Sequence, residues 1–283
     1  MLMDTFLIPV DFSDVSYNAA QYAVDMAEEL NAQKVIFYHS YKDAPIDVSR
    51  SEAGRNPYHE AAIKHLQTMV GKLHRIKRLT DRILLLADDQ SVRAGVEELV
   101  NVHQVSIIVM GVAGLSDIEN TLVGRHTLAV AESGVAPLLV VPRNHQLRSI
   151  KKVVYASDLI DVETETPINS IVQLVRPFRA QLHMVHVDYA LKYQSPATLL
   201  GQKQLMRYLD ELHPVFETIS DHRDTATGIY SYVKKQQADL ILIAAKSYRR
   251  NYHFLKRIFR PNVRKKLLNM TDVPVVLLKK KRS

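Results

Sequence analysis

The chain has 283 residues, of which 47% are hydrophobic and 24% charged, and it contains no cysteine. This composition is ordinary for soluble globular proteins, and the lack of cysteine excludes disulfides, a thiol nucleophile and cysteine-ligated metal sites. No apolar stretch approaches the ~20 residues of a membrane span, and the apolar run in residues 1–10 is too short for a signal peptide. We therefore expect a soluble, cytoplasmic protein with no membrane partner.

Charge divides the chain into two parts. Residues 1–146 carry 13 Lys and Arg against 18 Asp and Glu, a net charge of −5, whereas residues 147–283 carry 24 against 12, a net charge of +12. An acidic half joined to a basic half predicts two modules with different roles, with domains at 1–146 and 147–283. Two plainer interpretations stay open: the halves attract each other, or the basic half is simply solvated.

Apolar runs alternate with helical patterns along the first half. The predicted strands are residues 5–10, 34–38, 82–86, 105–110 and 138–141. The predicted helices begin after Ser13, a candidate N-cap, and cover 58–77, 92–102 and 127–133. Residues 42–57 are polar and are predicted to be a loop. This alternation predicts an α/β fold in which helices cover both faces of a parallel sheet.

The second half repeats the pattern of the first. Residues 152–158 parallel the first strand, with Asp158 opposite Asp11. Three further segments, 180–186, 238–244 and 272–278, parallel 32–39, 105–111 and 135–141. Four matches in the same order indicate an internal duplication, and so two five-stranded α/β domains. The linker 143–150 contains neither glycine nor proline, which predicts that the domains are docked rather than loosely tethered.

Three glycines, Gly111, Gly114 and Gly124, lie around the end of the fourth predicted strand. Where a buried strand passes into a glycine-rich turn, backbone N–H groups point outward, and the next helix adds the positive end of its dipole. Such a loop suits phosphate or sugar hydroxyls. The spacing is neither that of the Walker loop nor that of the Rossmann fingerprint, and a tight turn needing positive φ is the plainer explanation.

The spacing G-x2-G-x9-G resembles the nucleotide loop of the universal stress protein family, in its ATP-binding branch. Residues 6–13, FLIPVDFS, resemble the family's first strand and the Asp loop beside adenine. The resemblance covers nearly all of 1–142 and extends, without the glycines, over 150–278. It implies two tandem Rossmann-like domains of the adenine nucleotide alpha hydrolase type. Family domains associate through their last strands, so 138–142 and 275–279 would pair about a pseudo-two-fold axis.

The resemblance also implies a nucleotide site in the first domain, with Asp11 near adenine or ribose, the backbone near Ser40 at the adenine edge, and the glycines at ribose and phosphates. The implied set is Pro9, Val10, Asp11, Ser40, Met110, Gly111, Gly114, Gly124, Arg125, His126 and Thr127. The expected ligand is ATP or another adenine nucleotide, with Mg only if ATP is bound. The family has Ser or Thr where this chain has Arg125, which would contact a phosphate, fill the phosphate space or point to solvent. The alternative for Asp11 is a capping role at the helix start near Ser13.

The second half has lost this pattern. Ala244, Ser247 and Pro261 stand where the first half has its glycines, so we expect no nucleotide there. The segment 246–266 is instead basic, and aromatic side chains lie between its cations, as on some nucleic-acid surfaces. Weak, non-specific polyanion binding by this segment and the tail 279–282 is one interpretation. A solvated helix face with a solubilising tail is the other.

Catalytic and metal-binding motifs are absent from the sequence. His183 and His186 would face opposite sides of a strand, and His39 and His186 occupy matching strand ends where packing histidines are expected. We therefore predict a cytoplasmic stress-response protein that binds an adenine nucleotide in 1–146 and acts as a non-catalytic sensor or regulator. The alternative is a ligand-free scaffold whose basic second domain binds an acidic partner. A slow ATP hydrolase ranks lower because no general base is visible, and a homodimer is left open.

Overall fold

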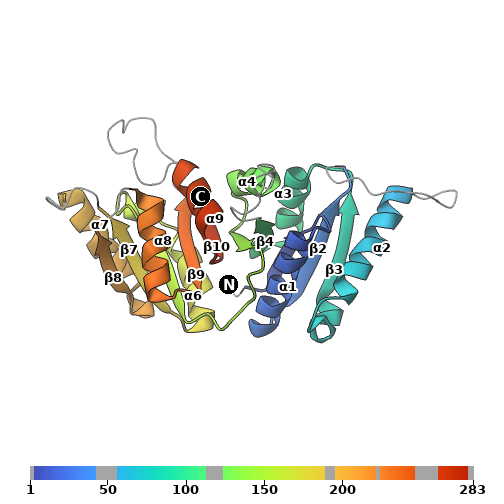
Figure 1. The fold of residues 1–283 in the computed structure, drawn as a ribbon, viewed down its shortest axis with the longest axis horizontal. Helices are drawn as coiled ribbons and strands as arrows, with labels where there is room; N and C mark the ends of the chain where they lie inside the picture. The colour runs from blue at the N-terminus through green and yellow to red at the C-terminus, as the bar shows by residue number, and fades with distance from the viewer. Residues whose placement is uncertain are drawn as a thin grey trace. The chain divides into compact units, whose positions relative to one another are not determined.

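The computed structural model describes residues 3–42, 56–112, 124–188, 195–220, 224–245 and 261–279. The chain divides into two compact units, Met1–Leu147 and Arg148–Ser283, which we call unit 1 and unit 2. Unit 1 runs from blue to green in Figure 1, and unit 2 continues from yellow-green to red. Each unit contains its own parallel strands with helices packed against them, so each is described by itself.

Unit 1 is built on parallel strands in the order β3-β2-β1-β4-β5. The strands are β1 (Thr5–Pro9), β2 (Lys34–Ser40), β3 (Ile83–Asp88), β4 (Ile107–Val112) and β5 (Leu138–Pro142). The helices are α1 (Asp14–Glu29), α2 (Pro57–Gly71), the 3-10 helix η1 (Ile76–Arg82), α3 (Val92–His103) and α4 (Gly124–Ser133). Strand order runs from β1 out to β3 and resumes on the other side of β1 with β4. The order therefore reverses between β1 and β4, and the predicted parallel α/β fold is confirmed.

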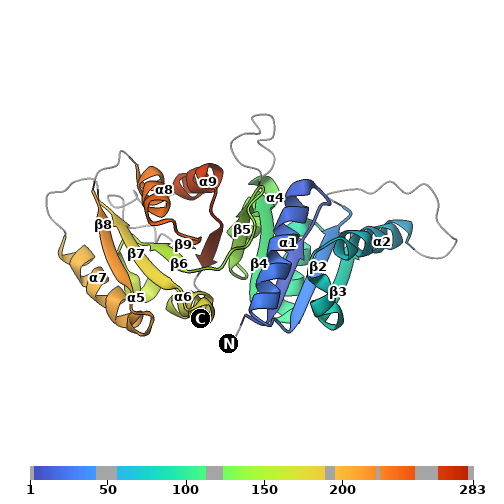
Figure 2. The same cartoon turned by 60° about the horizontal axis from the view of Figure 1, so that its bottom comes forward.

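The start of α1 follows the sequence prediction. The Ser13 hydroxyl oxygen accepts a hydrogen bond from Ser16 N at 3.2 Å, which confirms the predicted N-cap. The residues that recur at helical spacing are buried: Ala19, Ala20, Ala23 and Ala27. α1 packs against β4 and β5, and Figure 2 shows it lying across the sheet of unit 1. Small side chains on this face let the helix approach the strands closely.

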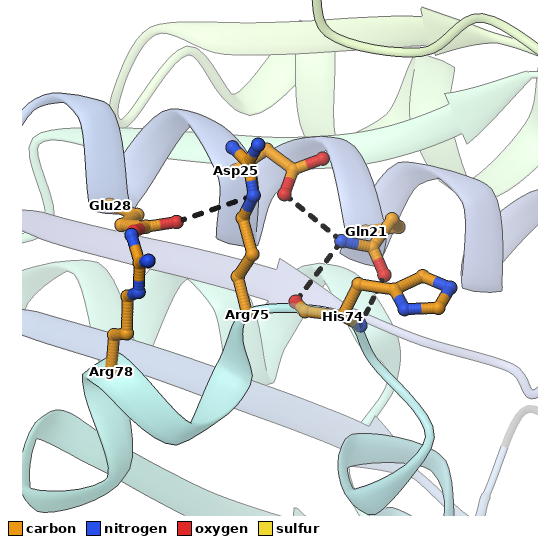
Figure 3. Close-up of polar contacts among 6 residues, drawn as sticks. All are labelled: Gln21, Asp25, Glu28, His74, Arg75 and Arg78. Carbon is orange, nitrogen blue, oxygen red and sulfur yellow. Dashed lines mark hydrogen bonds and ion pairs between the residues drawn. The ribbon is translucent and has the colours of Figure 1, made fainter.

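The predicted helix over 58–77 is wrong beyond residue 71, where α2 ends. Arg75 then takes a left-handed conformation, with φ 61°, and η1 follows. The Gln21 amide of α1 holds this connection, because it donates to the His74 carbonyl oxygen (3.3 Å) and accepts from His74 N (2.8 Å). Glu28 adds an ion pair with Arg75 at 3.8 Å. Figure 3 shows the full set of contacts among Gln21, Asp25, Glu28, His74, Arg75 and Arg78. Contacts with α1 thus redirect the chain.

Other predicted boundaries move by a few residues. β2 and β3 continue past their predicted ends because their parallel pairing extends to Ser40 and Asp88. α4 begins at Gly124, before the predicted start at residue 127. Gly134, expected to close this helix, has φ 57°, the left-handed conformation typical of a helix end.

Unit 2 has parallel strands in the corresponding order, β8-β7-β6-β9-β10. The strands are β6 (Lys152–Ala156), β7 (Gln181–Val187), β8 (Val215–Ile219), β9 (Leu240–Ala245) and β10 (Val275–Lys279). The α-helices are α5 (Val162–Glu165), α6 (Ile168–Val175), α7 (Pro196–Tyr208), α8 (Thr225–Gln236) and α9 (Pro261–Met270). Two 3-10 turns, η2 (Arg176–Phe178) and η3 (Asp210–Leu212), follow α6 and α7. The internal duplication is therefore confirmed at the level of strand order.

The units correspond residue by residue over much of their length. β1 and β2 match β6 and β7 without an insertion, and α3 and β4 match α8 and β9 in the same way. Ile36 of β2 therefore corresponds to His183 of β7, and Leu99 of α3 corresponds to Tyr232 of α8. The pairing of 138–142 with 275–279 stays a prediction.

Candidate functional site

The predicted site residues of unit 1 lie at the carboxyl ends of β1 and β4, the two strands between which strand order reverses. Pro9 ends β1, and Val10 and Asp11 follow it. Met110 and Gly111 lie near the end of β4. Pro9, Val10 and Met110 are buried, whereas Asp11 is exposed. Parallel strands bring their carboxyl ends to one edge, so these residues converge there.

Asp11 is already engaged in the structure. Its Oδ1 accepts hydrogen bonds from Ser13 N at 3.0 Å and from the Ser13 hydroxyl at 2.6 Å. Although the residue is exposed, partial desolvation of its carboxylate by the surrounding protein raises the pKa of Asp11, but the hydrogen bonds from Ser13 outweigh this effect and hold the pKa below its usual value. Because Ser13 caps α1, the helix-start role considered for Asp11 is present in the structure.

A group of rings beside Asp11 was not found by sequence reasoning. Phe12 has a φ of 64°, and its ring centroid lies 4.5 Å from that of His39 and 5.5 Å from that of His65 on α2. His39 is buried, and its Nδ1 lies 2.8 Å from the carbonyl oxygen of Val10. The left-handed conformation of Phe12 depends on tertiary packing, and no residue pattern predicts it. The one signal in the sequence was that Phe12 lies between Asp11, a predicted site residue, and Ser13, the predicted N-cap.

Ser40, at the end of β2, is buried and donates its hydroxyl to the carbonyl oxygen of Gln90 at 2.6 Å. This contact ties the end of β2 to the segment that precedes α3. The hydroxyl is therefore used within the protein, and the part of Ser40 that remains relevant to the predicted site is its backbone, as the sequence interpretation proposed.

Gly111 is explained by the close approach of α1. A Cβ at this position would lie 2.6 Å from the carbonyl oxygen of Val15 and 2.7 Å from its Cγ1. Gly111 is not among the residues with positive φ, so the tight-turn explanation is wrong for this glycine. Its lack of a side chain admits the first turn of α1 instead.

The start of α4 contacts the end of β4. The buried hydroxyl of Thr127 donates to the Gly111 carbonyl oxygen in a long contact of 3.5 Å. Gly124 begins the helix, and His126 is half-buried in its first turn. Gly114 and the side chain of Arg125 lie outside the described residues. The positive end of a ten-residue helix therefore lies near the carboxyl end of β4, the strand that neighbours β1.

The matching positions of unit 2 differ. Asp158 is buried, and its Oδ1 accepts from Ile160 N at 3.0 Å. Ala244 is buried in β9 in place of Gly111, and α9 begins with Pro261 in place of Gly124. Most of the basic segment 246–266, namely 246–260, lies outside the described residues, as does the tail beyond 279.

The histidines expected to pack do so. His39 and His186 are both buried, and each places Nδ1 near a backbone carbonyl oxygen, with His186 lying 3.0 Å from that of Ser157. His183 instead contacts the Tyr232 hydroxyl at 2.9 Å. Among the described residues no group of three His, Asp or Glu could hold a metal ion. Within those same ranges, no helix is both long and apolar enough to cross a bilayer.

Comparison with known proteins places these features in a family. The model of the universal stress protein family matches residues 3–142 and again 149–279. A universal stress protein from Archaeoglobus fulgidus DSM 4304 matches with 14% identity and a TM-score of 0.71, covering 99% of this chain and 100% of that one. A functionally unknown protein from Pseudomonas aeruginosa PAO1 matches with 13% identity and a TM-score of 0.59, covering 98% and 93%.

Shorter matches and curated sequences complete the comparison. A universal stress protein in complex with cAMP matches with 20% identity and a TM-score of 0.37, covering 50% of this chain and 98% of that one. No curated protein matches the chain. The family model covers nearly the whole length in two consecutive matches, and the chain therefore belongs to the universal stress protein family, with the family domain present twice.

Proposed function

We propose that unit 1 binds an adenine nucleotide and that the protein acts as a non-catalytic sensor or regulator in a stress response. The observation that carries the proposal is the convergence of Asp11, Gly111 and the start of α4 where strand order reverses between β1 and β4. In open α/β sheets, ligands bind outside the carboxyl ends of the strands at such a point.

The groups at this edge suit an anionic ligand that carries an aromatic base. α4 has no acidic residue in its first turn, so its N-terminal N–H groups and its dipole favour phosphate. The half-buried ring of Phe12, backed by the buried ring of His39, offers an aromatic group beside the end of β1. Mg²⁺ would enter only with ATP, on the phosphate oxygens, because the described residues hold no metal site of their own.

The ligand-free scaffold remains the second candidate, and specific contacts favour it. The Asp11 carboxylate is taken by Ser13, the Ser40 hydroxyl by Gln90, and the space beside Gly111 by Val15. Each of these residues thus has a role within the fold that needs no nucleotide. In this alternative the basic unit 2 would engage an acidic partner.

A substitution that copies unit 2 into unit 1 separates the candidates. Gly124→Pro removes one N–H at the start of α4, whereas proline is compatible with the first turn of a helix. If that N–H faces a phosphate, the affinity for ATP should fall about tenfold or more, as expected for a hydrogen bond to a charged group, and the affinity for adenosine should fall less. Calorimetric titration of the full chain with ATP, AMP and adenosine measures both affinities.

The matched control is Pro261→Gly at the corresponding position of unit 2, which should leave binding unchanged. Denatured wild-type protein should also release adenine nucleotide that chromatography can identify. A wild-type protein that neither releases nor binds any adenine nucleotide would contradict the proposal and favour the scaffold.

A further inference from the structure

One face of the sheet in unit 2 carries polar side chains around His183, at a position where unit 1 has the buried Ile36. His183 lies on β7 opposite Val154 of β6, and the neighbouring cross-strand pair is Lys152 with Gln181. On the other side of β7, Val185 pairs with Glu217 of β8. Residues paired across parallel strands, and residues two apart along one strand, point to the same face. Lys152, Gln181, His183 and Glu217 therefore share one face, and Tyr232 of α8 packs on it.

The contacts of His183 define the protonation of its ring. Nδ1 lies 2.9 Å from the Tyr232 hydroxyl, and Nε2 lies 3.1 Å from Oε1 of Gln181. Oε1 can only accept, so with this amide orientation Nε2 must carry the proton. The Nδ1 of a neutral ring then accepts from the Tyr232 hydroxyl. A second proton, on Nδ1, would take away the acceptor on which the tyrosine hydroxyl depends.

Both partners are almost completely removed from solvent. His183 is 6% exposed and Tyr232 is 7% exposed. At the corresponding positions unit 1 has Ile36, which is fully buried, and Leu99. Unit 1 therefore has an apolar residue at each of the two positions, whereas in unit 2 a histidine and a tyrosine occupy them and form a hydrogen bond. Of these residues, only His183 has a side chain that titrates near neutral pH.

The charged groups around His183 oppose its protonation on balance. Burial is the largest effect, and with the Lys152 ammonium on β6 it lowers the pKa of His183, while Glu217 on β8 acts in the other direction. Lys152 is held in place, since its Nζ donates to the Gln236 carbonyl oxygen of α8 at 3.0 Å. Tyr232 faces the ring as a neutral phenol, because burial and Glu217 raise its own pKa to about 12.

We propose that the His183–Tyr232 contact makes the attachment of α8 acid-sensitive, so that α8 opens from the sheet of unit 2 more often at mildly acidic pH than at neutral pH. The sign follows from linkage. A histidine whose pKa is lower in the folded state than in the open state takes up protons on opening, so its stabilising contribution is complete above about pH 6.5 and is lost as the pH falls below it. Loss of α8 would also disturb α9, which packs on it and is linked to it by the Lys266–Asp224 and Lys234–Asp272 ion pairs.

Hydrogen exchange of the full chain tests this proposal. Protection of amides in α8 (Thr225–Gln236) is compared at about pH 7.5 and about pH 5.5, after correction for the intrinsic exchange rate, with protection in α3 (Val92–His103) of the same molecule. We expect protection in α8 to fall by up to about tenfold, the limit set by one pH unit below the ordinary histidine pKa. α3 ends in His103, whose pKa burial and Lys34 also lower, so α3 has an acid response of its own, and the variants of His183 must identify the part that belongs to α8.

Two variants identify the titrating group. His183→Ile copies the residue of unit 1, and His183→Gln keeps a neutral hydrogen-bonding side chain in case the apolar variant fails to fold. In either variant that folds, protection of α8 should no longer fall at the lower pH, whereas protection of α3 should behave as in the wild type. The proposal is overturned if α8 of the wild type is equally protected at the two pH values, or if a folded His183 variant keeps the wild-type response of α8.

Discussion

The strand that opens each unit, β1 in unit 1 and β6 in unit 2, ends in the same backbone turn. Phe12 and Leu159 occupy matching positions with φ of 64° and 60°. Behind the turn, His39 and His186 place Nδ1 against the carbonyl oxygen of Val10 and Ser157 in the same way. A buried ring nitrogen that satisfies a buried carbonyl oxygen is thus part of the framework of both units.

Beyond this turn the units diverge. Unit 1 continues directly into α1, whose first turn touches Gly111 through Val15. Unit 2 passes instead through Asp161, which has a φ of 47°, and the four-residue helix α5. There the close approach is made by Gly201 of α7, where a Cβ would lie 1.9 Å from the Leu159 carbonyl oxygen. The comparison teaches that the histidine belongs to the framework shared by both units, whereas the glycines serve different close contacts: Gly111 of β4 admits the first turn of α1, and Gly201 of α7 admits the turn at Leu159.

The largest effect should come from adding a side chain where α1 meets β4. In Gly111→Val the new Cβ would meet the backbone of Val15, which cannot rotate away, so α1 must shift. We expect a loss of unfolding free energy at the upper end of about 1–3 kcal/mol. Hydrogen exchange read separately for peptides of unit 1 and unit 2 should show the loss in unit 1 alone.

The matched control is Ala244→Gly in β9, which makes unit 2 resemble unit 1. It should cost only about 0.5–1 kcal/mol, the backbone penalty of a glycine within a strand, together with the loss of one buried methyl group. Equal costs for the two substitutions would contradict the view that α1 demands the glycine. Since the effect needs no ligand, it also separates the structural role of Gly111 from nucleotide binding.

A middle-sized effect should appear equally in both units when the framework histidines are replaced. His39→Leu and His186→Leu each leave a buried carbonyl oxygen without its ring donor. We expect each to lower the unfolding free energy of its own unit by about 1–2 kcal/mol, within the range for an unsatisfied buried group. Unit-specific hydrogen exchange measures both. A large loss of unfolding free energy for one substitution and none for the other would show that the two histidines do not have equivalent roles.

Much of the fold could be predicted from the sequence because strand signals are local. Apolar runs such as 34–40 and 181–187 fix the strands, and their repetition fixes the duplication. The end of α2 was predicted six residues too late, although Gly71 at its end was a signal in the sequence. The path of the chain after α2 could not be predicted, because it is held by Gln21, which is far away in sequence.

The candidate site shows the same limit. The carboxyl-end positions of Asp11 and Gly111 followed from the strand pattern. That Asp11 binds Ser13 and that Gly111 faces Val15 depends on how α1 packs, which spacing alone does not contain. The polar contact of His183 with Tyr232 joins two elements that no sequence motif connects.

The smallest effect concerns the caps of the matching helices α3 and α8. Ser91 caps α3 by accepting from Ala94 N at 3.3 Å. Asp224 caps α8 by accepting from Thr227 N at 3.1 Å, and it also pairs with Lys266 Nζ at 2.8 Å. Unit 2 therefore has a charged cap where unit 1 has a neutral one. Burial raises the pKa of Asp224, but the hydrogen bonds from Lys266 and Thr227 outweigh burial and lower it to about 2.

The substitution Asp224→Ser, which copies the cap of unit 1, should keep the cap and remove the charge. Because the side chains of Asp224 and Lys266 are 39% and 53% exposed, water screens their pair, and we expect a cost of only a few tenths of a kcal/mol near neutral pH. The carboxylate stabilises the folded state fully above its ordinary pKa near 3.8, and this contribution is lost as the pH falls toward about 2. The wild type and the variant should therefore converge in the protection of α8 over this acid range, and also at high salt, which screens the ion pair. A difference that persists at low pH would mean that the cap geometry, rather than the charge, distinguishes the two helices.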